Sequence, residues 1–173
     1  WLSLGGFHEA NPKVKGTYWT THFIINAEGQ IFSKYRKMHL YSAELSNKGG
    51  TDVFENKNHL QGSDMTKPCF SPIGYLGLSN SYDIRFPELY RKLTLQGAQA
   101  LLIPSAITAK TGASHWETML RTRAIENQCY VIAAAQCGQS DTGVLNFGHS
   151  MVVDPWGDII ARLVTMRATS YVR

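Results

Sequence analysis

A hydroxyl, a carboxylate and a guanidinium lie close together in the chain, at Ser81, Asp83 and Arg85. They follow the apolar run 74–80, which fits a buried strand, and precede Pro87, which suits the first turn of a helix. In an open α/β sheet, ligands bind beyond the carboxyl ends of strands, near the next helix N-terminus. This junction is therefore a candidate for nucleophilic chemistry. Composition alone favours a structural interpretation, in which Ser81 is a turn or N-cap residue and Asp83 pairs locally with Arg85.

A second candidate is the segment 35–40, Tyr-Arg-Lys-Met-His-Leu. Lys37 has β-rich, partly apolar surroundings and is followed by His39, so its ammonium could stabilise an oxyanion. The alternative is a basic edge strand whose charges discourage aggregation, and this pattern taken alone favours that alternative. A serine-hydrolase motif is not formed, because the run 77–81 lacks the closing glycine of G-x-S-x-G.

Composition bounds the class of protein. The 173 residues suffice for one domain with a buried core, and we expect a single domain over 1–173. The net charge of +4 is dispersed, which argues against nucleic acid as a partner, and no apolar run is long enough for a membrane span. Three cysteines without a disulfide framework indicate a reducing compartment, either the cytoplasm or the mitochondrion. The histidines lack metal-ligand spacing, so no metal is expected.

Strands and helices alternate in the middle of the sequence. Apolar and β-branched runs predict strands at 22–26, 30–34, 74–80, 100–103, 129–135, 149–153 and 158–163. A helix is expected from Pro87 to the residue before Gly97, and a second from a capping box at Ser114 to about Asn127. The polar stretch 42–71 is expected to be a long loop. The order predicts an α/β fold with a parallel or mixed sheet covered by helices.

These motifs carry a resemblance to a known family. The run GYLGLSNSYDIRFPELYRKL resembles the nucleophile region of the nitrilase superfamily of carbon–nitrogen hydrolases, where a strand ends in Cys-Tyr-Asp-x-Arg-Phe-Pro-Glu, and YRKMHL resembles its catalytic-lysine segment. Three further blocks are similar to the Nit branch, which includes the Nit domain of Nit–Fhit fusion proteins and the deaminated-glutathione amidases: WLSLGGFHE, LLIPSAITAKTGASHWETMLRTRAIENQCYVIAAAQCG and GHSMVVDPWGDIIA. The resemblance covers nearly the whole chain.

The resemblance implies an α-β-β-α sandwich with mixed sheets, here incomplete at the N- and C-terminal ends, that assembles as a homo-oligomer without metal or cofactor. It also implies Glu–Lys–Cys chemistry, which hydrolyses a small ω-amide such as deaminated glutathione to acid and ammonia. By position, Lys37 matches the lysine and Ser81 the nucleophile. Glu55 matches a supporting glutamate, with Glu44 as its rival.

Other residues fall in segments that line or support the family's pocket, and Glu126 in the RAIEN helix is interpreted as structural. The expected substrate-binding residues are Tyr82, Arg85, Phe86, His115, Trp116 and Glu117. The expected partners are a small-molecule amide, further copies of the chain and a fused or associated Fhit domain, with neither nucleic acid nor membrane.

The sequence departs from the family in two ways. Ser81 stands where the family has cysteine, and a hydroxyl depends on a positioned base far more than a thiol does. The family's general-base glutamate is expected upstream of Trp1. We therefore expect impaired catalysis, and the alternative is a catalytically inactive domain that serves as a binding or scaffold protein. A nucleic-acid or membrane-surface binder is a third hypothesis, supported only by the net charge.

Overall fold

A six-stranded mixed sheet forms the centre of the computed structural model, which describes residues 1–44, 53–141 and 143–163. The strand order is β13-β12-β9-β8-β7-β6, with β7, β8 and β9 parallel and the outer strands antiparallel. The strands are β6 (Cys69–Ser71), β7 (Gly74–Leu78), β8 (Ala100–Leu102), β9 (Tyr130–Ala133), β12 (Met151–Val153) and β13 (Ile159–Arg162). The short apolar runs of β7, β8 and β9 suit parallel strands that are buried on both faces.

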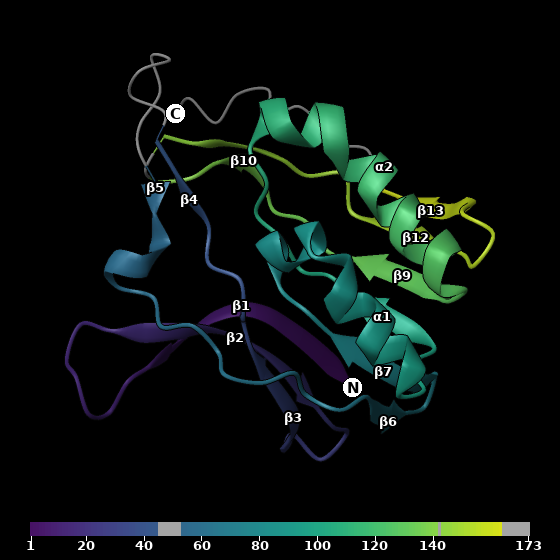
Figure 1. Cartoon of the computed structure of the whole chain (residues 1–173), viewed down its shortest axis with the longest axis horizontal. Coiled ribbons are helices and arrows are strands. Elements are labelled where there is room, and N and C mark those ends of the chain that lie inside the picture. Colours follow the sequence, from purple (N-terminus) through teal and green to yellow (C-terminus); the bar gives the residue numbers. More distant parts are fainter. Residues whose placement is uncertain (45–52, 142, 164–173) are drawn as a thin grey trace.

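Two helices cover this sheet (Figure 1). Helix α1 (Pro87–Leu95) has proline in its first turn and is followed by Gly97 at a φ of +96°, as expected. Helix α2 (Ala109–Asn127) buries one apolar stripe against β9 and β12. Side chains that the two helices contribute to the core are Leu89, Tyr90, Leu93, Trp116, Leu120 and Ala124.

A second, three-stranded antiparallel sheet packs against the first. It consists of β1 (Leu2–Ala10), β2 (Tyr18–Ile25) and β3 (Ile31–Arg36). Ile24 and Tyr35 join the same hydrophobic core as the central strands. Buried His22 links the two sheets, because its Nδ1 lies 2.9 Å from the carbonyl oxygen of Ser79. Its Nε2 lies 2.7 Å from Ser3 Oγ on the neighbouring strand β1 of its own sheet. The described residues thus form helix, sheet and sheet layers, and the expected α/β class with mixed sheets is confirmed.

The expected hairpin over 22–34 is confirmed as β2 and β3, but helix α2 begins earlier than predicted. Thr108 is its N-cap, and Ser114 lies inside the helix, where its hydroxyl donates to the carbonyl oxygen of Lys110. The capping box predicted at Ser114 is therefore wrong. Tertiary packing overrides the weak helix propensity of Gly112, because this glycine lies so close to Phe147 that a Cβ would fall 2.3 Å from its ring.

Three further features of the chain differ from the predictions. The stretch predicted as a loop contains β4 (Ser42–Ala43), β5 (Val53–Phe54), a 3-10 turn (Glu55–Lys57) and β6, while 45–52 lies outside the described residues. Strand β1 and the hairpin of β10 (Cys137–Gln139) and β11 (Leu145–Phe147) were not predicted, because their sequences lack a clean apolar alternation.

No helix of the described residues is long and apolar enough to cross a membrane.

Burial of His22 makes the stability of the fold depend on pH. Desolvation lowers the pKa of this histidine to about 4. Between pH ~6.5 and 4, the unfolded chain therefore binds a proton at this histidine that the folded chain excludes. The free energy of unfolding has its full value above pH ~6.5 and falls by about 3 kcal/mol as the pH is lowered towards 4. Chemical denaturation across this range measures the decline. His22→Gln removes the titrating group, so its profile is expected to be flatter, and parallel profiles would contradict the assignment.

Candidate active site

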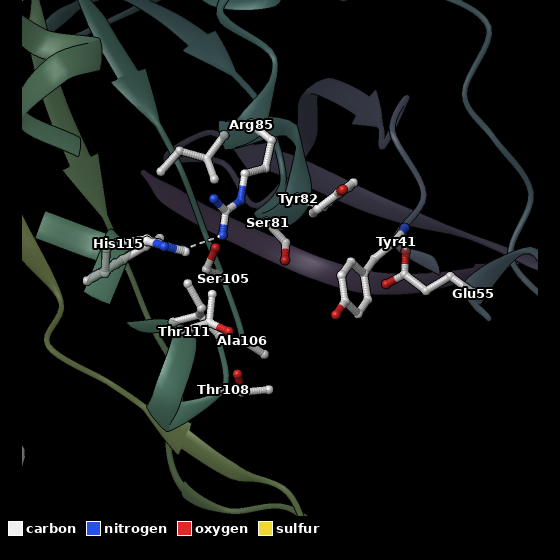
Figure 2. Close-up of a pocket in the computed structure, with 13 residues that line it drawn as sticks. Tyr41, Glu55, Ser81, Tyr82, Arg85, Ser105, Ala106, Thr108, Thr111 and His115 are labelled. Atoms are coloured by element: carbon white, nitrogen blue, oxygen red, sulfur yellow. Dashed lines mark hydrogen bonds between the residues drawn. The ribbon is translucent and has the colours of Figure 1, made fainter. Parts of the chain in front are cut away.

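Two adjoining cavities open where the sheets meet the start of α2. One, of about 400 Å³, is shown in Figure 2. Its neighbour, of about 760 Å³, shares Glu55, Ser81, Ser105 and Ala106 with it and adds Lys37. Lys37 and Ser81 therefore line one cavity, although they come from different sheets.

Lys37 follows β3 directly and is only 1% exposed. Its Nζ donates to Glu55 Oε2 at 2.6 Å, and the same oxygen accepts the backbone N–H of Tyr41 at 2.7 Å. A buried ammonium needs such a counter-ion, because desolvation of an unpaired charge is costly. The edge-strand interpretation of Lys37 is thus wrong. Of the two glutamates considered, Glu55 forms the pair, whereas Glu44 is exposed.

Ser81 opens a 3-10 turn (Ser81–Arg85) between β7 and α1, at a φ of +50°. This left-handed conformation costs a serine on the order of 1 kcal/mol or more and persists only where the surroundings impose it. The backbone N–H of Ser81 donates to the carbonyl oxygen of Pro104 at 2.8 Å. Two N–H groups of Arg123 on α2 donate to the carbonyl oxygen of Ile84, which secures the other end of the turn. The hydroxyl is thereby held in the cavity (Figure 2).

Asp83 is fully buried and joins the two candidate segments. Its carboxylate accepts the Tyr35 hydroxyl at 2.7 Å and the backbone N–H groups of Asn80 and His39 at 2.8 and 3.1 Å. In addition, the distance between His39 Nδ1 and Asp83 Oδ1 is 2.7 Å. Burial, together with the charge of Asp83, raises the pKa of Tyr35. The local Asp83–Arg85 ion pair is therefore wrong, because Asp83 faces the core. Sequence reasoning missed this role.

Arg85 instead faces the smaller cavity. Its Nη2 lies 2.9 Å from His115 Nδ1, and both residues line that cavity together with Tyr82 and Trp116 (Figure 2). The Trp116 ring is buried, and its Nε1–H donates to the carbonyl oxygen of His149 at 3.0 Å. A guanidinium beside a mixed polar and apolar cavity can bind a carboxylate in bidentate fashion.

Phe86, Glu117 and Glu126, which fall in segments expected to line or support the pocket, lie outside the lining of both cavities. Phe86 stacks on His39 at a centroid distance of 3.6 Å and so supports the segment after Lys37. Glu117 is half exposed and pairs with Arg162, contrary to its grouping with Trp116, because neighbouring helical residues point about 100° apart. Glu126 pairs with Arg123, in agreement with a structural role.

Other lining residues were not identified from the sequence. Ser105 follows β8, so it lies at the carboxyl end of the strand next to β7, where the sheet rule places ligands. The remaining ones of the smaller cavity are Tyr41, Ile84, Ala106, Ile107, Thr108 and Thr111. No group of three or more metal-ligating side chains occurs in the part of the chain that the structure describes.

Asn80 precedes Ser81 and lines the larger cavity. It is 2% exposed, and its Nδ2 has no hydrogen-bond partner among the described residues. An unsatisfied buried donor costs about 1–3 kcal/mol, so the unpaired Nδ2 destabilises the folded state.

A paired, buried lysine and a hydroxyl on a strained strand-to-helix turn thus line one cavity within this sandwich of sheets. The model of the carbon–nitrogen hydrolase family matches residues 1–172, and the chain belongs to this family. Comparison with individual proteins shows which members of the family the chain is similar to. The chain is 49% identical over 162 residues to the nitrilase and fragile histidine triad fusion protein NitFhit of Caenorhabditis elegans, covering 94% of this chain and 36% of that protein.

Further relatives agree with this placement. A deaminated glutathione amidase from Dictyostelium discoideum is 48% identical over 163 residues, covering 92% of this chain and 55% of that protein. The crystal structure of C. elegans NitFhit superposes with a TM-score of 0.89 at 48% identity, over 95% of this chain and 39% of that one. The chain thus spans about half, or less, of the length of these relatives.

Removal of the Asp83 carboxylate tests its place in the site. Asp83→Ala leaves the buried Tyr35 hydroxyl and two backbone N–H groups without an acceptor, so the free energy of unfolding is expected to fall by about 3–5 kcal/mol. Urea denaturation measures the change. Exposed Asp64, whose hydrogen-bond partner among the described residues is its neighbour Ser63, provides the matched Asp64→Ala control, expected to stay within about 0.5 kcal/mol. Equal losses in the two variants would contradict the role of Asp83.

Proposed function

We propose that this chain is the central part of an amidase that hydrolyses a small ω-amide to an acid and ammonia. The observation that carries the proposal is the shared cavity in which the Lys37–Glu55 pair and Ser81 meet. The names of two relatives, deaminated glutathione amidase and NitFhit, support the same class of reaction.

In the proposed reaction, Ser81 Oγ attacks the carbonyl carbon of the amide and its proton passes to a general base. By resemblance to the family, that base is a glutamate upstream of Trp1. The Lys37 ammonium stabilises the oxyanion, and Glu55 holds the ammonium in place. The C–N bond then breaks and the nitrogen leaves as ammonia after taking up a proton. Water cleaves the resulting ester, which releases the acid and restores the hydroxyl.

The substrate class follows from Arg85. Its guanidinium lines the cavity that also contains Ser81, so a small molecule with an amide at one end and a carboxylate at the other fits both groups. A deaminated-glutathione-like ω-amide has this chemistry. Tyr82, His115 and Trp116 supply the remaining walls of the proposed substrate site.

Ser81 also favours a second candidate, a domain that binds such an amide without turning it over. A hydroxyl in a site suited to a thiolate lowers the rate by several powers of ten. In either case we propose a homo-oligomer, and the fusion architecture named for the C. elegans relative supports a fused or associated Fhit domain. We further propose that the protein acts in the cytoplasm or in mitochondria.

Substitution at position 81 separates the two candidates. In the full-length protein, Ser81→Cys is expected to raise kcat/KM for an ω-amide at least ~100-fold, since a thiol is far the better nucleophile in this setting. Ammonia release measures the rate, and Ser81→Ala gives the background. Turnover at ordinary rates with serine, lost in Ser81→Ala, would contradict the binding domain. No release above background from Ser81→Cys on several ω-amides would contradict the amidase.

Arg85 is tested through substrate charge. Arg85→Met is expected to raise KM for a carboxylate-bearing ω-amide about 10–100-fold, because a charged hydrogen bond is lost, and to leave an uncharged amide of equal length unaffected. Steady-state kinetics on both substrates measures the difference. Arg121→Met on α2 is the matched control, since Arg121 bonds the carbonyl oxygen of Gly157 and lies outside both cavities. Equal effects on the two substrates would exclude a carboxylate contact.

A further inference from the structure

The side-chain amide of Asn80 takes no part in the mechanism described above. Asn80 lines the larger cavity beside Ser81 and Lys37, and its Nδ2 is buried without a partner among the described residues. Its backbone N–H is satisfied separately, by Asp83 Oδ2 at 2.8 Å. The fold therefore gains nothing that is visible in the structure from the side-chain N–H groups.

A structural role explains the oxygen of the Asn80 side chain, which accepts the backbone N–H of Asp83 in a capping box, but not its N–H groups. Buried polar groups in proteins are almost always hydrogen-bonded, and an apolar side chain of similar size would avoid the orphaned donor. Asn127, the other buried asparagine of the described residues, shows the usual arrangement, because its Nδ2 donates to the carbonyl oxygen of Arg123 at 2.9 Å. The contrast singles out Asn80 as a donor that is kept unpaired at the wall of a cavity.

We propose that Asn80 Nδ2 donates a hydrogen bond to the carbonyl oxygen of a bound amide and to the oxyanion formed from it. This inference rests on the proposed amidase site. Lys37 already directs one N–H to Glu55, so a second, neutral donor strengthens binding of the developing negative charge. The terminal amide torsion of asparagine is soft, so a small rotation presents the N–H to the ligand. Because Nδ2 has no partner among the described residues, its N–H groups give up no hydrogen bond there when the amide enters.

The proposal predicts a small effect on stability and a large effect on catalysis. In the full-length protein, Asn80→Leu removes the capping oxygen together with the orphaned donor, so Tm is expected to change little. The kcat for an ω-amide is expected to fall about 10²–10³-fold, with a much smaller change in KM. The matched control, Asn127→Leu, removes a donor that is satisfied in the folded state, so it is expected to lower Tm and to leave kcat unchanged. Asn80→Ala replaces the leucine variant if that variant does not fold.

A binding experiment keeps the proposal testable without turnover. Calorimetry compares glutaramate, which has an amide and a carboxylate, with 5-methylhexanoate, in which an isopropyl group replaces the amide. Asn80→Leu is expected to weaken glutaramate binding about 10-fold, the loss of one hydrogen bond, and to leave 5-methylhexanoate unaffected.

The outcomes separate this inference from the amidase proposal. Unchanged kcat and glutaramate affinity in Asn80→Leu, with an active parent protein, overturn the role of Asn80 alone. Equal weakening of both ligands also overturns it, because the effect is then one of shape. Glutaramate that is neither bound nor hydrolysed by the parent protein overturns the inference and the amidase proposal together.

Discussion

The buried carboxylate of Asp83 is the interaction on which the site depends. It joins the segment after β3 to the turn after β7, because it accepts hydrogen bonds from Tyr35 and His39 on one side and from Asn80 on the other. It adds to the contact between His22 and the carbonyl oxygen of Ser79, the other polar link described between the two sheets. A carboxylate with several hydrogen-bond donors tolerates deep burial, which a bare charge does not. The same link sets how Lys37 and Ser81 face their common cavity.

The buried charge of Lys37 is compensated in a different way from that of Asp83. Lys37 is compensated by one carboxylate, whereas Asp83 is compensated by several hydrogen-bond donors, and Glu55 in turn accepts the backbone N–H of Tyr41. The ammonium is therefore fixed in position while it keeps further N–H groups for a ligand. Arg85, in contrast, lines the smaller of the two adjoining cavities, beside His115. Fixed and accessible cations at the two ends suit a ligand with one reacting and one anionic end.

Much of the fold and part of the candidate site could be predicted from the sequence. Strands β7, β8 and β9 and helix α1 were predictable because their apolar periods and flanking Pro87 and Gly97 agree with the tertiary structure. The start of α2 was not, because the packing of Gly112 against Phe147 outweighs local capping preference. Asp83 was misassigned because a spacing of two residues suggests an ion pair, whereas the partners that decide its role lie more than forty residues away. The catalytic roles of Lys37, Ser81 and Glu55 stay predictions.

Gly62 packs tightly against the end of β3, next to Lys37. Its backbone lies so close to β3 that a Cβ would fall 2.2 Å from the carbonyl oxygen of Arg36, and its N–H donates to the carbonyl oxygen of Lys37 at 2.8 Å. The stretch that begins at the counter-ion Glu55 is thus clamped, by the one residue type without a side chain, onto the strand end that carries the ammonium. Peeling this stretch away would expose the lysine and remove its partner in one event. Exchange of the Gly62 amide hydrogen with solvent therefore reports directly on the integrity of the charged pair.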